Sequence, residues 1–247
     1  MNVFITGVSS GLGRALTNEF LTERHKVWGV ARRKIEAWDN DGRLTSNGSF
    51  RFSVCDVSVM ADAERVRAQM KEAGFVPDIV VLNAGVMEND LDGTFSYDVF
   101  KKTYAINLFG AVAWLDLFLP VFVERDGGTF VAISSLSSYR GLNNKKIAYS
   151  GSKAALSMTF ECMRLQMTPS KVRFVTVNPG GMSPDESRTG LLKIHYKSAA
   201  QKIVRRLASP GLNGVFDFPF LNAFISKTMR FLPDFLVSRI VKRCAGS

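Results

Sequence analysis

A tyrosine and a lysine four positions apart are the residues in this chain best suited to acid–base chemistry. Tyr149 and Lys153 lie in a segment with a helical pattern, and their spacing places both side chains on one helix face. A free tyrosine has a pKa of about 10, and a neighbouring ammonium group stabilises the phenolate and lowers that pKa. The same pair also occurs by chance on ordinary helices, so this interpretation needs support from the rest of the sequence.

The first twenty residues predict a dinucleotide site. An apolar run ends at Thr6, and glycines follow at positions 7, 11 and 13 before a helical pattern begins. Gly7 permits a tight turn, Gly11 lets the backbone approach a pyrophosphate, and Gly13 lets the helix pack closely on the strand. The spacing is Gly-x-x-x-Gly-x-Gly, and the strand before it and the helix after it favour phosphate binding. The predicted cofactor-binding residues of this segment are Thr6, Gly7, Ser9, Ser10, Gly11, Leu12 and Gly13.

The end of the second apolar strand indicates which dinucleotide is bound. Ala31 stands where an acidic residue would hydrogen-bond the adenosine ribose 2′-hydroxyl, and Arg32 and Arg33 follow it. The missing carboxylate removes repulsion, and an arginine fork suits a 2′-phosphate. We therefore predict NADP(H) rather than NAD(H); the alternative is a pair of surface arginines at a loop start.

Two further strand ends carry residues that suit a cofactor. Asp56 and Val57 follow the third strand, and Asp56 is placed to accept a hydrogen bond from the adenine amino group. Alternatively, Asp56 serves only the turn, in which we expect Ser58 to cap the next helix. The fourth strand ends in Asn83-Ala84-Gly85, where small residues would let the backbone lie against the cofactor, although such a turn decides little by itself.

Composition limits the classes of protein that fit. The chain has 247 residues, of which 46% are hydrophobic, and this suits one globular domain. We expect no membrane-spanning helix and no leader peptide, because no apolar run is long enough and the first strand begins at residue 2. Three scattered cysteines and two histidines favour a reducing compartment and argue against disulfides and a metal site. The expected location is therefore the cytoplasm.

The net charge of +10 is compatible with nucleic acid, an anionic membrane face or anionic small molecules as partners. The basic residues are spread along the chain, and no nucleic-acid-binding module accompanies them. We therefore attribute the charge to cofactor recognition and solvated surface, and we expect no nucleic-acid partner.

Strand-like and helix-like stretches alternate along the chain. Short apolar runs predict strands at residues 2–6, 27–31, 50–55, 79–83, 129–134 and 172–178. Helical patterns occupy residues 13–23, 61–73, 97–122 and 149–168. The alternation predicts one α/β domain over residues 1–247, with the doubly wound parallel sheet of a Rossmann fold and its ligands beyond the carboxyl ends of the strands.

Together these motifs resemble the short-chain dehydrogenase/reductase family, in its short single-domain branch. The resemblance covers about residues 2–182. It rests on motifs that stand in the family's order: Thr6-Gly7-x-x-x-Gly11-x-Gly13, Asn83-Ala84-Gly85, Asn107 in Ile106-Asn107-Leu108, Ser134-Ser135, Tyr149-x-x-x-Lys153 and Asn178-Pro179-Gly180.

The resemblance implies four catalytic residues. Tyr149 would protonate the carbonyl oxygen, and Ser135 would orient that oxygen. Lys153 would bind the nicotinamide ribose and lower the pKa of Tyr149. Asn107 would hold a water in a proton relay, in a helical region that its short polar side chain disturbs.

The spacing from Ser135 to Tyr149 is one residue longer than is usual in the family. Three other serines therefore stay open as alternatives, at positions 134, 137 and 138. We favour Ser135 because it closes the fifth strand in an Ile-Ser-Ser pattern.

The resemblance also implies that Pro179 and Gly180 pass the nicotinamide ring, with Met182 beside them in the predicted cofactor site. Many family members place a threonine four residues past this glycine, where the chain has Pro184. Either Ser183 or Thr189 could take over that contact, or it is missing.

The sequence after residue 182 departs most from the family. Residues 185–196 fit the place of a mobile substrate lid. Residues 215–247 form an aromatic C-terminal extension that opens with a strand, and residues 231–243 carry apolar side chains on one helical face, at 231, 232, 235, 236 and 240. Packing on the body or on a partner subunit is the favoured use of that face, ahead of a cap over the substrate pocket or docking on a membrane surface. The phenylalanines within residues 216–224 fit either an apolar pocket or the core.

The sequence therefore predicts an NADPH-dependent enzyme that reduces a ketone or aldehyde on a small molecule, or catalyses the reverse oxidation, with Tyr149 as general acid/base. One alternative is a 3-oxoacyl-carrier reductase, since a basic surface would suit an acidic carrier, although the unusual tail argues against it. Another is a non-catalytic NADP-binding sensor or partner protein, against which the presence of all four catalytic-type residues argues. The resemblance further implies a homodimer through helices 97–122 and 149–168.

Overall fold

In the computed structural model, seven parallel strands form one sheet. The structure describes residues 1–35, 48–88, 95–141, 146–185, 187, 189–209 and 211–245, with side chains as far as residue 239. The strand order is β3 (Phe50–Val54), β2 (Lys26–Ala31), β1 (Asn2–Thr6), β4 (Ile79–Leu82), β5 (Gly128–Ile133), β6 (Val172–Pro179) and β9 (Val215–Phe218). The order reverses between β1 and β4, which is where open parallel sheets form a ligand crevice at the carboxyl ends of their strands.

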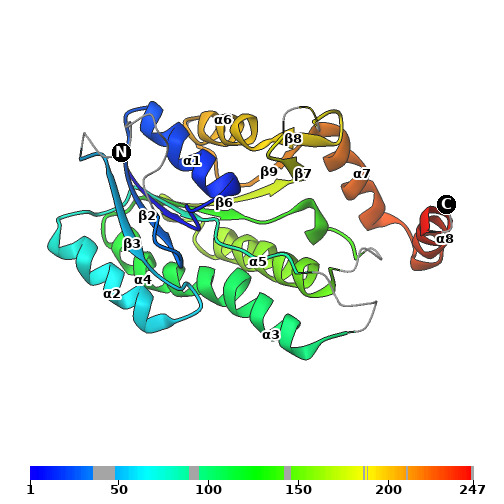
Figure 1. Ribbon diagram of the computed structural model, residues 1–247, viewed down its shortest axis with the longest axis horizontal. Coiled ribbons are helices and arrows are strands. Elements are labelled where there is room, and N and C mark those ends of the chain that lie inside the picture. The colour runs from blue at the N-terminus through cyan, green and yellow to red at the C-terminus, as the bar shows by residue number, and fades with distance from the viewer. Residues whose placement is uncertain are drawn as a thin grey trace.

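Helices cover both faces of this sheet (Figure 1). One face carries α1 (Gly11–Thr22) and α6 (Tyr196–Leu207), and the other carries α2 (Met60–Glu72), α4 (Gly110–Glu124) and α5 (Ile147–Gln166). Each face has its own apolar core, because the strands are buried on both sides and alternate side chains point to opposite faces. The predicted doubly wound α/β domain is confirmed, and the six predicted strands and four predicted helical segments lie where the periodicity placed them, whereas α6 was not predicted.

The predicted helix 97–122 contains a break. α3 (Tyr97–Tyr104) and α4 are joined by a π-helical segment, Ala105–Phe109, with Asn107 buried at its centre. The expected departure from a regular helix at Asn107 is thus confirmed. Of the helices that the structure describes, only this continuous one is long and apolar enough, by length and composition, to span a membrane. Core helices meet the same test, and here Trp114, Phe118 and Phe122 are fully buried against the sheet.

The chain after β6 forms a small second sheet before it returns to the main one. β7 (Gly181–Ser183) and β8 (Lys193–His195) pair in parallel, and α6 begins directly after β8. The predicted lid, residues 185–196, therefore contains β8 and ends at the first residue of α6. Residues 186 and 188 of this segment lie outside the described residues, and the mobility of the lid stays a prediction.

The C-terminal segment differs from its prediction in two ways. Residues 215–218 belong to the main sheet as β9, which confirms the expected strand, but helix α7 (Phe220–Phe231) then follows where no helix was predicted. The predicted helix 231–243 begins too early, because Phe231 ends α7, Leu232 has an extended backbone and α8 (Asp234–Ala245) starts after Pro233. Proline disfavours a helical conformation in the residue before it, which accounts for this boundary.

The aromatic cluster under α4 offers a test of the packing. Phe118 lies between Phe4 and Trp114 with ring centroids 5.6 and 5.9 Å away, and it is fully buried. Phe118→Ala should lower the free energy of unfolding by about 3–5 kcal/mol, because the lost contacts leave a cavity in a close-packed core. Urea unfolding followed by far-ultraviolet circular dichroism measures this. Val123→Ala, at a half-exposed position on the same helix, is the control and should change stability by less than about 1 kcal/mol; equal losses in both variants would contradict the packing.

Candidate active site

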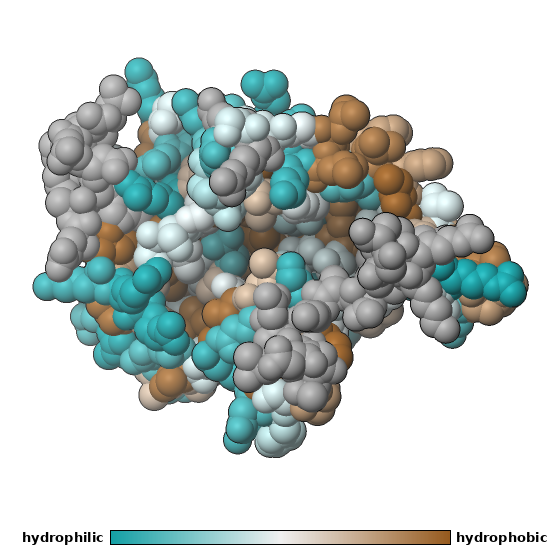
Figure 2. All heavy atoms as spheres, turned by 45° about the vertical axis from the view of Figure 1, so that its right-hand side comes forward, coloured by the Kyte–Doolittle hydropathy of each residue, from teal (hydrophilic) through white to brown (hydrophobic). Residues whose placement is uncertain are grey.

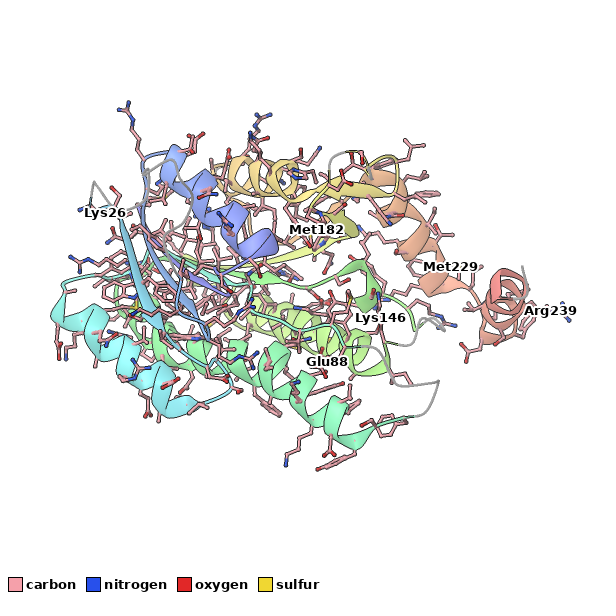
Figure 3. The ribbon with its side chains drawn as sticks, in the orientation of Figure 1. Lys26, Glu88, Lys146, Met182, Met229 and Arg239 are labelled. Carbon is pink, nitrogen blue, oxygen red and sulfur yellow. The ribbon has the colours of Figure 1, made fainter. Side chains whose placement is uncertain are left out.

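A cavity of about 410 Å³ opens at the carboxyl ends of the strands. Residues from the ends of β1, β2, β4, β5 and β6 and from the first turns of α1 and α6 line it. Most of the residues predicted to bind the cofactor are among them: Gly7, Ser9, Ser10, Gly11, Leu12, Gly13, Arg32, Arg33, Asp56, Val57, Asn83, Ala84, Gly85, Tyr149, Lys153, Pro179, Gly180 and Met182. Met182 extends from β7 beside α1 (Figure 3).

The glycine loop requires its glycines for different reasons. Gly7 and Gly11 have φ angles of +74° and +55°, in the left-handed region that side chains disfavour. A Cβ on Gly13 would lie 2.1 Å from the carbonyl oxygen of Gly7, so any side chain there would push α1 away from β1. Helix α1 starts without a side-chain cap at Ser10. The first backbone N–H groups of this helix can therefore donate hydrogen bonds to an anion, as at other phosphate-binding helix ends.

Thr6 positions this loop and does not line the cavity, which corrects its predicted role as a cofactor-binding residue. Its buried hydroxyl accepts hydrogen bonds from the backbone N–H groups of Asn83 and Ala84, both at 3.0 Å. In return, the Asn83 amide donates to the carbonyl oxygens of Thr6 and Gly7 at 3.0 and 3.2 Å. These bonds hold the ends of β1 and β4 together, and the Thr6 side chain is turned to β4 because of them.

Arg32 and Arg33 lie at the end of the cavity formed by β2, next to Ala31 and Asp56. Both arginines are exposed. Asp56 accepts hydrogen bonds from the backbone N–H and the hydroxyl of Ser58, at 3.0 and 2.6 Å. The prediction that Ser58 caps the next helix is wrong, because α2 begins two residues later and its N-cap position is Val59, with no side-chain cap.

Tyr149 lines the cavity, and Ser135, which is not among the lining residues, is hydrogen-bonded to its phenol. Ser135 ends the strand segment after β5 and caps the short 3-10 turn Leu136–Ser138, where its oxygen accepts a hydrogen bond from the N–H of Ser137 at 3.1 Å. The alternative Ser134 has its hydroxyl bound to the carbonyl oxygen of Lys153 and to Ser157, at 2.9 and 2.7 Å.

Burial controls the ionisation of this pair. The pKa of Tyr149 lies above its ordinary value because the phenol is buried, and the hydrogen bond to Ser135 opposes that rise. Burial lowers the pKa of Lys153 to about 8, since the charged ammonium is disfavoured away from water. The expectation that Lys153 lowers the pKa of Tyr149 stays a prediction: the ammonium lies 5.9 Å from the phenol ring centroid and donates to the carbonyl oxygen of Ile133 at 2.7 Å.

Asn107 ties three parts of the site together. Its amide oxygen accepts from the N–H of Val86 at 2.8 Å, and its amide nitrogen donates to the carbonyl oxygen of Val86 and to Ser152, both at 3.0 Å. Ser152 in turn donates to the carbonyl oxygen of Tyr149 at 2.8 Å. The side chain lies behind the cavity wall and positions the segment after β4 against α5. The predicted water in a proton relay stays a prediction.

The segment after β6 is supported by the start of α7. A Cβ on Gly180 would lie 2.8 Å from the amide nitrogen of Asn222, and this amide donates to the carbonyl oxygen of Leu192 at 2.6 Å. Of the two candidates for the missing threonine, Ser183 is buried and accepts a hydrogen bond from the N–H of Asp185 at 3.1 Å. Neither Ser183 nor Thr189 is among the residues that line the cavity, so the replacement of the threonine stays open.

Tyr196 is a cavity residue that the sequence did not reveal. It is the first residue of α6, and its ring would lie 3.6 Å from a Cβ on Gly11, across the mouth of the glycine loop. It falls at the end of the predicted lid, and only the fold brings it to α1. Met87, which belongs to no motif, and Ile106, the neighbour of Asn107, also line the cavity.

Comparisons with known proteins decide the family. The family profile described as short chain dehydrogenase matches residues 1–190, which is more than half of the chain. The chain belongs to the short-chain dehydrogenase/reductase family. It is 29% identical over 243 residues to an uncharacterized oxidoreductase of Myxococcus xanthus, covering 97% of this chain and 95% of that one.

Solved structures show the same fold at low identity. A short-chain dehydrogenase from Streptomyces avermitilis superposes with a TM-score of 0.79 and 20% identity, covering 98% of this chain and 96% of that one. The closed form of a serine dehydrogenase complexed with NADP+ gives a TM-score of 0.76 and 20% identity, covering 88% and 94%. As a short-chain dehydrogenase/reductase, this protein is an oxidoreductase.

The lowered pKa of Lys153 predicts a pH dependence of stability. The amine changes from a pKa of 10.5 in the unfolded chain to about 8 in the folded protein, so between these values the unfolded chain holds a proton that the folded protein has released. Stability should therefore rise with pH across this window. Relative to Lys153→Met, the wild type should gain roughly 3 kcal/mol of unfolding free energy between about pH 8 and 10.5.

Denaturant unfolding at a series of pH values measures that difference. Tyr149 and Cys55 also titrate at high pH, but both variants contain them, so their effects cancel in the comparison. A difference that stays flat or falls as the pH rises would contradict a buried, desolvated ammonium.

Proposed function

We propose that this protein is an NADPH-dependent oxidoreductase that reduces a ketone or aldehyde to the alcohol, or catalyses the reverse oxidation. The observation that carries the proposal is the hydrogen bond between Ser135 and the phenol of Tyr149, because Tyr149 and Lys153 line a cavity with the features of a dinucleotide site. The residues present fit the cofactor, since the glycines at 7, 11 and 13 leave free the space that side chains would fill beside the helix end. When bound, NADPH supplies a hydride to the carbonyl carbon.

The chain's own residues handle the proton and the carbonyl oxygen. A phenol with a raised pKa is protonated at neutral pH, which is the form that a general acid needs for reduction. The hydroxyl of Ser135 is hydrogen-bonded to the same phenol, and with a substrate bound it would donate a hydrogen bond to the oxygen that develops negative charge. Lys153 and Asn107 hold the surrounding backbone, through the carbonyl oxygen of Ile133 and both polar atoms of Val86.

The choice of NADPH is supported by the end of β2. Solved structures with this fold include a serine dehydrogenase complexed with NADP+ and a 4-hydroxyisoleucine dehydrogenase complexed with NADH, so the fold is compatible with either. In this chain Ala31, Arg32 and Arg33 line the cavity where the adenosine ribose would lie. Two exposed guanidinium groups there favour a 2′-phosphate over a free hydroxyl.

Replacement of the proposed acid tests the reaction. Tyr149→Phe keeps the ring and removes only the hydroxyl, so turnover of aldehydes and ketones with NADPH should fall by about 10²- to 10⁴-fold. NADPH affinity, measured by fluorescence titration, should change by less than about threefold. Tyr97→Phe, at an exposed position on α3, is the matched control and should retain full activity. Substantial turnover by Tyr149→Phe would overturn the assignment.

Titration with both nucleotides tests the cofactor. Arg33→Ala and Arg32→Ala should each weaken NADPH binding by about 10- to 100-fold, the loss expected for a hydrogen bond to a charged group, and leave NADH binding nearly unchanged. Lys26→Ala removes a positive charge from the opposite end of the same strand (Figure 3) and should alter neither affinity. If the arginine variants lower the affinities for NADPH and NADH equally, the arginines do not recognise the 2′-phosphate.

A further inference from the structure

The excess positive charge of this protein is confined to its C-terminal quarter. Residues 1–186 contain 21 Lys and Arg against 20 Asp and Glu, whereas residues 187–247 contain 11 against 2. The basic residues themselves are spread along the chain, but the acidic residues that would balance them are nearly absent from this quarter. The segment that supplies β8, α6, β9, α7 and α8 is strongly basic, and the rest of the chain is nearly neutral.

The same segment exposes large apolar side chains. The outer face of α7 carries Phe220 and Phe224, which are 83% and 60% exposed, with the half-exposed Leu221 and Ile225 beside them. Leu191, in the turn before β8, is 79% exposed. Figure 2 shows apolar atoms gathered at the upper right of the molecule, where β8 and α7 lie side by side in Figure 1. We call this surface, formed by residues 191, 192, 220, 221, 224 and 225, the apolar rim.

The inner side of α7 is firmly attached, so the rim is a fixed surface. Ala223 is buried, Asn222 donates to the carbonyl oxygen of Leu192, and Lys227 pairs with Asp217. The carboxylate of Asp217 is buried and also accepts hydrogen bonds from Tyr139. The apolar side chains of the rim point away from these contacts and toward solvent.

The rim borders the active-site cavity. Asn222 and Pro219 lie within 3.1 Å of the position of a Cβ on Gly180, which lines the cavity at its proposed nicotinamide end. Leu192 is joined to the same Asn222. The apolar rim is therefore on the side of the molecule from which a substrate would reach Tyr149.

We propose that the apolar rim docks on an anionic lipid bilayer. Phenylalanine and leucine side chains beside lysine and arginine are the combination that binds the bilayer interface, where apolar groups enter and basic groups face anionic headgroups. The same segment supplies exposed basic residues: Lys193 and Lys197 follow the rim residue Leu192 closely in sequence, and Lys202, Arg205, Arg206 and Arg230 lie farther along α6 and α7. A second copy of this chain is a less suitable occupant, because two basic surfaces would face each other.

This surface differs from the one that the sequence suggested. The predicted membrane face used residues 231–243 as one helix, but that segment is divided between α7 and α8. Docking through the rim would turn the substrate side of the cavity toward lipid. Given the proposed function, the carbonyl substrates would be molecules dissolved in the bilayer.

Flotation with vesicles tests the docking directly. The full chain should float with phosphatidylcholine vesicles that contain about a third phosphatidylserine, and bind pure phosphatidylcholine about tenfold less, because each basic residue near the surface adds to the attraction. Raising NaCl to about 0.5 M should release most of the protein, since salt screens the headgroups. Failure to float with the anionic vesicles, or equal binding to both vesicle compositions at low salt, would overturn the proposal.

A triple variant locates the contact. Leu191→Ser, Phe220→Ser and Phe224→Ser together should weaken vesicle binding by about tenfold or more. The matched control changes three exposed apolar residues elsewhere, Met60→Ser, Val76→Ser and Val123→Ser, and should bind as the wild type does. Circular dichroism checks that both variants fold. Vesicle binding that survives in the rim variant would refute the proposal.

Light scattering after size-exclusion chromatography tests whether a second copy of the chain, and not a bilayer, covers the rim. If the wild type is an oligomer that ignores vesicles, and the rim variant is a monomer, the rim is a contact between copies and the bilayer proposal fails. NADPH titration of the rim variant separates this proposal from the proposed function. Intact NADPH affinity with lost vesicle binding supports docking, whereas reduced NADPH affinity would mean that the substitutions disturb the cavity itself.

Discussion

The close approach of α1 to the end of β1 is the constraint on which the site depends. It is possible only because position 13 has no side chain, since a Cβ there would lie 2.1 Å from the Gly7 carbonyl oxygen and 2.5 Å from the Asn83 amide nitrogen. The same Asn83 amide holds that carbonyl, and the Thr6 hydroxyl fixes the backbone of Asn83. These hydrogen bonds therefore fix the start of α1, the glycine turn and the end of β4 relative to one another. The backbone N–H groups at the start of α1 would already be in place when a phosphate binds.

Much of this architecture could be predicted because its causes are local. Glycines at 7 and 13 and short apolar runs depend on neighbours in sequence or on a generic sheet, so the pattern alone identified them. The role of Thr6 could not be predicted from the sequence, because its hydroxyl accepts hydrogen bonds from backbone N–H groups that lie 77 and 78 residues away along the chain. The place of Tyr196 at the glycine loop likewise depends on how α6 packs beside α1. Helix α7 was missed although its sequence is amphipathic, because the phenylalanines within residues 216–224 were assigned to a pocket or the core and not to one face of a helix.

The pKa shifts of the site residues also could not be predicted from sequence patterns. The spacing of Tyr149 and Lys153 suggested that the ammonium lowers the pKa of the phenol, but it cannot say how much water reaches either group. Here burial acts on both residues in opposite directions, because it raises the pKa of an acid that ionises to an anion and lowers that of a cation. Both effects favour the neutral forms. A proton donor kept neutral, next to a serine whose oxygen is already occupied by a backbone N–H, is an arrangement suited to giving up a proton only when charge develops on a substrate.

The chain divides its functions along its length. The family profile ends at residue 190, and the strong excess of basic residues begins at 187, so the shared scaffold is nearly neutral and the segment beyond it carries the charge. The same boundary separates the residues proposed for the reaction, the last of which is Met182, from the apolar rim. The two parts remain in contact, because Asn222 packs on Gly180, β7 pairs with β8 and Tyr196 faces the glycine loop. We propose that the scaffold sets the kind of reaction, and that the basic, apolar segment sets which surfaces and substrates approach it.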